Sequence, residues 1–133
     1  MLKSQIIITA DGSKTIHFPE WNESYHSKHG ALQEAKHVYI QSGLAYHIEK
    51  YASKTINLLE IGFGTGLNAM LSYLFAKEKN ININYHSLEK YPLQSSALKE
   101  LNYTEFFTKE SDVFEKLHST KCELPTEINS SFT

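Results

Sequence analysis

The chain has 133 residues, of which 41% are hydrophobic and 21% charged, so it can form one globular domain with a modest core. It contains no apolar run long enough to cross a bilayer, no secretory signal and a single cysteine, Cys122, so we expect no membrane partner and a cytoplasmic location. The net charge is −2 and all 13 basic residues are lysines, so charge by itself gives no indication of a nucleic-acid site.

The first 54 residues predict a β-hairpin followed by two helices. Residues 5–9 and 15–18 are short β-prone runs, and the Asp-Gly pair between them supplies the positive φ angles of a tight turn. Apolar residues then recur at helical spacing over 30–42, and Gly43 stands where a left-handed C-terminal cap belongs. A second helix is predicted over 44–52.

From residue 55 onward the pattern alternates between strand and helix. Strands are predicted at 56–62 and 83–89, and helices at 67–79, 93–101 and 112–118. Strands separated by helices predict parallel pairing with right-handed crossovers. The fold class is therefore α/β.

The most informative stretch, residues 57–70, reads NLLEIGFGTGLNAM. It places Glu60 at the end of a buried strand and then three glycines at alternate positions, before a helix begins. A dinucleotide fingerprint needs a glycine where Leu67 stands, which disfavours an oxidoreductase, and no P-loop lysine follows. Glycines at this point let the backbone approach a ligand, while the helix N-terminus offers N–H donors.

The second predicted strand ends in Glu89, which follows Gly66 by 89 − 66 = 23 residues. An acid at about this spacing accepts hydrogen bonds from ribose hydroxyls in nucleotide-binding βαβ units, and it repels a phosphate at the same place. The predicted ligand is a nucleoside without a ribose phosphate, which S-adenosylmethionine fits. Two structural alternatives stay open: close packing alone as the reason for the glycines, and a solvated strand end for Glu89.

Three segments together resemble the methyltransferase domain of the MnmC/MnmD family: ESYHSKHGALQEAKHVYIQSGL (23–44), LLEIGFGTGLNAM (58–70) and HSLEKYPL (86–93). Members of this family complete 5-methylaminomethyl-2-thiouridine at the wobble position of certain tRNAs. They transfer a methyl group from S-adenosylmethionine to an exocyclic amine. The resemblance covers essentially the whole chain and implies a Rossmann-like methyltransferase fold, preceded by the hairpin and helices.

The resemblance also implies roles for individual residues. The cofactor loop would consist of Glu60, Gly62, Phe63, Gly64, Thr65, Gly66 and Asn68, and Glu89 would hold the ribose. The family's N-terminal motif matches Tyr25, His26, Ser27 and Gly30, which would border the same pocket. The implied partners are tRNA and an FAD-dependent oxidoreductase that acts in the same pathway.

The chain departs from the family pattern at its C-terminal end. Family members continue through further strands and an Asp-Ala-Phe-Ala-Pro-like segment, whereas the only aspartates here are Asp11 and Asp112. We therefore expect no catalytic residue within the chain, because the catalytic aspartate would lie beyond its end. The whole chain, 1–133, would be a single truncated domain, with 1–54 as an N-terminal extension and 55–133 as the first part of the core. An incomplete sheet would favour self-association.

Other functions remain possible from the residues alone. The same loop would serve an S-adenosylmethionine-binding module without activity, or a small-molecule methyltransferase. Whether the chain is an enzyme is therefore open. No metal is expected, because His26, His29 and His37 lack a cysteine or carboxylate at ligand spacing to complete a zinc site.

Overall fold

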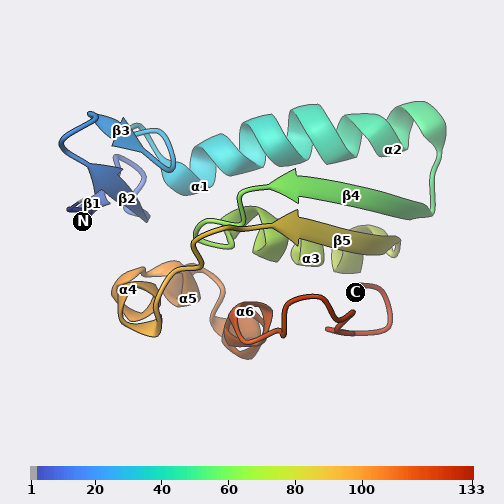
Figure 1. Cartoon of the computed structure of the whole chain (residues 1–133). Helices are drawn as coiled ribbons and strands as arrows, with labels where there is room; N and C mark the ends of the chain where they lie inside the picture. The colour runs from blue at the N-terminus through green and yellow to red at the C-terminus, as the bar shows by residue number, and fades with distance from the viewer. Residues whose placement is uncertain (1–2) are drawn as a thin grey trace.

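The structure, a computed structural model, describes residues 3–133 (Figure 1). At the N-terminus, β1 (Gln5–Ile8), β2 (Lys14–Phe18) and β3 (Glu23–Ser24) form an antiparallel sheet in the order β1-β2-β3. The predicted hairpin is confirmed, and its turn contains Gly12 with a φ of 83°. The short strand β3 was not predicted, because two residues carry no alternation that a sequence reading could detect.

A single long helical rod follows, and it corrects the prediction of two helices. It comprises α1 (Ala31–Glu34), the π-helical segment η1 (Ala35–Ala45) and α2 (Tyr46–Tyr51). Gly43 lies inside the rod, so the predicted cap there is wrong; the left-handed cap is Ala52, with a φ of 51°. The apolar residues on either side of Gly43, such as Ile40 and Leu44, pack on the core from one continuous helix. Their burial outweighs the cost of about 1 kcal/mol for glycine within a helix.

The α/β unit consists of β4 (Thr55–Ile61), α3 (Leu67–Lys79) and β5 (Asn82–Leu88). The two strands pair in parallel, in register from Thr55 with Asn82 to Ile61 with Leu88, which confirms the predicted parallel sheet. Along the other edge of β5, residues 131–133 run parallel to the strand, with a bridge between Ile83 and Phe132. In Figure 1 the long helical rod runs beside β4, and the C-terminal segment lies beside β5.

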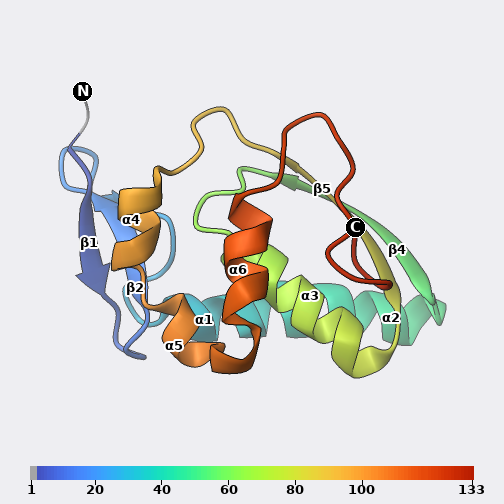
Figure 2. The same cartoon turned by 90° about the horizontal axis from the view of Figure 1, so that it is seen from below.

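The remaining elements are short: α4 (Ser95–Glu100), α5 (Tyr103–Phe106), the 3-10 helix η2 (Thr108–Glu110) and α6 (Ser111–His118). The helices predicted at 93–101 and 112–118 are confirmed within two residues at each end, whereas α5 and η2 were not predicted. Figure 2, seen from below, shows α6 across the N-terminal half of α3, with α4 and α5 between α6 and the N-terminal sheet.

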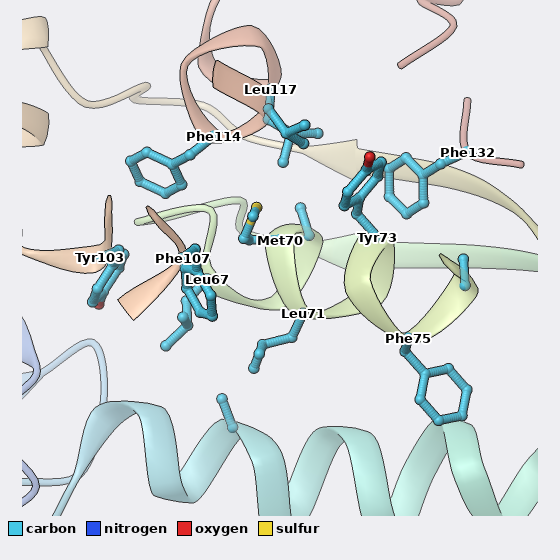
Figure 3. Close-up of a cluster of buried hydrophobic side chains, with 14 of the residues drawn as sticks. Leu67, Met70, Leu71, Tyr73, Phe75, Tyr103, Phe107, Phe114, Leu117 and Phe132 are labelled. Atoms are coloured by element: carbon cyan, nitrogen blue, oxygen red, sulfur yellow. The ribbon is translucent and has the colours of Figure 1, made fainter. Parts of the chain in front are cut away.

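The hydrophobic core is centred on α3, which buries residues around nearly its whole circumference. Figure 3 shows Leu71 and Phe75 directed toward the long helical rod, and Tyr73 directed toward Phe132 on the other side. Phe114 of α6 closes the core above the start of α3. Within residues 3–133, no helix is both long and apolar enough to span a membrane.

One face of the parallel sheet remains uncovered. The side chains that alternate inward, among them Ile56 and Ile83, are buried, whereas Leu59, Ile61 and Leu88 are 65%, 74% and 62% exposed. Among the described residues, no strand pairs with the edge of β4 that faces away from β5. The structure therefore leaves an apolar surface and an open strand edge side by side.

Candidate cofactor site

A cavity of about 500 Å³ opens at the carboxyl ends of β4 and β5, where the glycine loop passes from β4 into α3. This volume lies in the range of small-molecule sites, about 300–1,000 Å³. The lining residues come from the N-terminal motif, the long helical rod, the loop and the end of β5: Tyr25, His26, Glu34, Ala35, Val38, Tyr39, Glu60, Gly62, Phe63, Gly64, Thr65, Leu67, Asn68 and Glu89. Segments up to 64 residues apart therefore meet at one site.

The three glycines of the loop are required for three different reasons. All have positive φ angles: 88° at Gly62, 56° at Gly64 and 74° at Gly66. A Cβ at Gly62 would meet no atom within 4 Å, so only its backbone angle demands glycine, and its open side belongs to the cavity. A Cβ at Gly64 would lie 3.2 Å from the Tyr25 ring, and one at Gly66 would lie 2.7 Å from His118 Nε2. Gly66 itself is not among the lining residues.

Glu89 joins the two strand ends across the mouth of the site. Its Oε2 accepts a hydrogen bond of 2.9 Å from the Gly64 N–H, and its Oε1 accepts one of 2.8 Å from the Tyr91 N–H. A carboxylate offers about four acceptor positions, so each oxygen retains one after these bonds. The carboxylate is thus fixed in place and still able to accept two ligand hydroxyl groups.

Glu60 is held in a polar network beneath the loop. Its Oε1 accepts from Asn68 Nδ2 at 3.2 Å, and its Oε2 accepts from the Ser87 hydroxyl at 3.1 Å. Burial raises the pKa of Glu60, the hydrogen bonds lower it in part, and the charge of Glu89 raises it further. The buried Tyr85 hydroxyl faces the same carboxyl group without a well-aligned hydrogen bond. Glu60 therefore orients Asn68 at the start of α3 and adds negative charge to the cavity.

The N-terminal motif divides into residues at the cavity and residues beside it. Tyr25 and His26 line the cavity, whereas Ser27 and Gly30 do not. His26 Nδ1 lies 2.9 Å from the hydroxyl of the fully buried Thr15, which fixes the ring. Burial lowers the pKa of His26, opposed in part by the charge of Glu34, so the imidazole is neutral at pH 7. Burial raises the pKa of Tyr25, and the charge of Glu89 adds to this.

Gly30 has a packing role, because a Cβ there would lie 2.7 Å from Asp11 Oδ2. That oxygen accepts a hydrogen bond of 2.8 Å from the Gln33 N–H in the first turn of the helical rod. Burial acts to raise the pKa of Asp11, but hydrogen bonds from Ser13, Gln33 and Thr9 outweigh it and lower the pKa to about 2. The hairpin turn thus caps the rod and sets the position of Tyr25 and His26 beside the loop.

Among the lining residues that were not predicted, the polar ones are Glu34 and Tyr39. Both lie on the helical rod, where their spacing resembles that of ordinary exposed and core positions. The Tyr39 hydroxyl is 2.6 Å from that of Ser72 on α3, and burial raises the pKa of Tyr39 to about 12. Only the contact between the rod and α3 brings them to the cavity.

The cavity has a strongly negative character. Three carboxylates line it, those of Glu34, Glu60 and Glu89, and its lining contains no lysine. Such a site disfavours a phosphate group and favours a ligand that carries positive charge. A sulfonium compound with a free ribose has these properties, so the residues present fit S-adenosylmethionine. A pyrophosphate-containing dinucleotide does not fit.

The curated proteins that this chain resembles in sequence share the name MnmC. No family model matches the chain. The chain is 31% identical over 88 residues to the tRNA 5-methylaminomethyl-2-thiouridine biosynthesis bifunctional protein MnmC of Leptospira interrogans, a match that covers 61% of this chain and 13% of that protein. With the protein of the same name from Campylobacter fetus it shares 31% identity over 83 residues, 62% of this chain and 13% of the relative. With the protein of the same name from Burkholderia thailandensis it shares 26% identity over 102 residues, a match that covers 74% of this chain and 15% of that protein.

The chain thus matches only about an eighth of the length of these relatives. Among solved structures, MNMC2 from Aquifex aeolicus superimposes with a TM-score of 0.64 at 24% identity, over 100% of this chain and 41% of that one. An identity this low shows a shared fold. Together with the sequence matches, it confirms that this chain is similar in sequence to part of the MnmC proteins and has the fold of MNMC2.

Proposed function

We propose that the chain is a Rossmann-like, S-adenosylmethionine-dependent methyltransferase domain that acts in 5-methylaminomethyl-2-thiouridine biosynthesis on tRNA. The observation that carries the proposal is the glycine loop bonded to Glu89 at the rim of a cavity with three carboxylates and no lysine. The similarity to MnmC supplies the substrate class. An FAD-dependent oxidoreductase would act in the same pathway.

The residues of the chain have distinct parts in this proposal. Glu89 accepts the ribose hydroxyls, and the backbone of Gly62 and Gly64 allows close approach of the cofactor. Glu60 favours the positive charge of the ligand and holds Asn68 in place. When bound, S-adenosylmethionine supplies an electrophilic methyl group.

Methyl transfer also requires a neutral amine and a group that accepts its proton. Neither Asp11 nor Asp112 lines the cavity. Among residues 3–133, the side chains in the cavity that could accept this proton are the glutamate carboxylates and the imidazole of His26, which burial keeps neutral. We assign the contact with the amine-bearing substrate to Tyr25, because it lines the cavity beside His26 and is 40% exposed.

The proposal is tested first by calorimetric titration of the whole chain with S-adenosylmethionine and S-adenosylhomocysteine, with NAD and NADP as comparison ligands. We expect binding of the first pair only. Trp21, the chain's only tryptophan, gives a second readout, because it packs on Phe18, which packs on Tyr25 at the cavity. Binding of NAD, or of none of the four ligands, would contradict the proposal.

The second step separates the candidate activities. Radiolabelled methyl transfer to tRNA that carries the aminomethyl group distinguishes an enzyme from a binding module without turnover. A small-molecule methyltransferase is the second candidate, favoured by the acidic cavity and the net charge of −2. A tRNA site predicts affinity that falls steeply with salt concentration, whereas a small neutral or cationic substrate does not.

A further inference from the structure

The glycine loop is contacted from below by a residue that is remote from it in sequence. His118, the last residue of α6, places Nε2 3.1 Å from the Thr65 carbonyl oxygen. Its ring lies between two aromatic rings, with centroid separations of 5.1 Å to Phe63 and 4.7 Å to Phe114, both edge to face. The ring is not among those that line the cavity, so it contacts the loop from outside the cavity.

This contact fixes the proton arrangement of the imidazole. A carbonyl oxygen accepts only, so Nε2 must carry the hydrogen and donate it to Thr65. Burial lowers the pKa of His118, and the hydrogen bond to the Thr65 carbonyl raises it only in part. The neutral Nε2–H form is therefore the one that holds the loop.

The Thr65 carbonyl that accepts this hydrogen bond lies between two glycines of the loop. Thr65 stands between Gly64 and Gly66, and both glycines adopt left-handed backbone angles. Glycine backbones have the widest conformational choice, so a loop rich in glycine is ordered for binding only where other contacts restrain it. Thr65 is 1% exposed, and its hydroxyl faces the buried hydroxyl of Tyr103, so α5 and α6 enclose it from below.

Gly66 leaves room for the same His118 ring. A Cβ at this position would lie 2.7 Å from His118 Nε2 and 3.1 Å from a Phe63 ring carbon. The absent side chain leaves the space through which the imidazole reaches the Thr65 carbonyl. Gly66 thus makes room for the His118 ring that contacts the loop, whereas Gly62 lines the cavity on the other side of the loop.

We propose that His118 is a positioning residue, which holds the glycine loop in its ligand-binding conformation through the hydrogen bond to Thr65. The inference rests on the proposed function in one respect, that the loop binds S-adenosylmethionine. The support itself is a property of the chain without ligand. Loss of one hydrogen bond of this kind weakens ligand binding by roughly five- to tenfold.

The test compares two variants of equal side-chain length in the whole chain. His118→Gln keeps an N–H donor near the position of Nε2, and His118→Met keeps the packing volume without a donor. We expect S-adenosylhomocysteine affinity to fall roughly five- to tenfold in His118→Met and to stay within about twofold of wild type in His118→Gln. Amide hydrogen exchange at residues 63–66 of the ligand-free chain is expected to accelerate only in His118→Met.

Equal binding and equal exchange in the two variants would overturn the inference. A further measurement needs no variant: nitrogen chemical shifts of wild-type His118 are expected to report the neutral Nε2–H form, and the Nδ1–H form would refute the hydrogen bond. If wild type binds no S-adenosylhomocysteine, the proposed function fails, while the exchange and chemical-shift measurements still decide the role of His118.

Discussion

Replacement of Glu89 by glutamine tests the site most directly. The carboxylate accepts hydrogen bonds from the N–H groups of Gly64 and Tyr91, one on each oxygen. A carboxamide has one oxygen, so Glu89→Gln leaves one of these donors facing an NH₂ group and removes the negative charge that favours ribose hydroxyls. Hydrogen bonds to charged groups contribute about 1.5–3 kcal/mol in protected sites. Because Glu89 is only half-buried, we expect the loss of folding stability to be smaller, about 1 kcal/mol.

Ligand affinity should fall further, because the ribose would lose one of its two acceptor oxygens together with the negative charge. We expect a loss of about 1.5–3 kcal/mol, roughly ten- to hundredfold in Kd, for S-adenosylhomocysteine measured by calorimetry. The matched control is Glu49→Gln, which removes the same charge from an exposed position on α2. Equal affinities of the two variants would refute the assignment of Glu89 to the ribose, and so would a larger loss in the control.

Three further outcomes are expected. Gly66→Ala should destabilise the chain by about 1–3 kcal/mol more than Gly62→Ala, measured by urea unfolding. Both substitutions strain a positive φ, but only at Gly66 would the new Cβ collide with the neighbouring rings of His118 and Phe63. Equal losses of unfolding free energy would contradict this. Burial lowers the pKa of His118 below 6.5, so the folded state binds fewer protons than the unfolded state. The stability that this contributes is present above pH 6.5 and is lost as the pH falls from 6.5 through the lower pKa of the folded state. The unfolding free energy should drop more between about pH 7.5 and about pH 5.5 in wild type than in His118→Gln, and parallel profiles would count against it. Exposed apolar residues beside the open edge of β4 predict self-association. Analytical ultracentrifugation should show an average mass that rises with protein concentration, and the double variant Leu59→Lys, Leu88→Lys should suppress this rise. A wild-type chain that stays monomeric would exclude this surface as an interface.

The sequence predicted the α/β unit well because its elements are locally encoded. The helix predicted at 67–79 has the same bounds in the structure, and both core strands shift by only one residue. The glycine spacing also excluded a dinucleotide fingerprint at Leu67 before any geometry was known. These features depend on side-chain period and backbone freedom, which are properties of short segments.

The sequence failed where long-range packing decides. Gly43 looks like a helix end, but burial of the residues on either side carries the helix through it. Gly30 looks like part of a ligand motif, but its place is explained by Asp11, which approaches it from the hairpin. His118 carries no local signal at all, because a histidine at the end of an amphipathic helix is an ordinary surface residue in sequence.

The sequence by itself therefore determined the composition of the loop, an acid, three glycines and a second acid, and from this it predicted a nucleoside ligand without a ribose phosphate. Only the tertiary structure decided how each residue serves the site. The folded chain forms the hydrogen bond between Glu89 and the Gly64 N–H and places His118 where only a glycine fits at position 66. It also brings Glu34 to the cavity. The physical reason is that backbone conformation is set by neighbours in the chain, whereas charge, burial and support at a site are set by residues that meet only when the chain folds.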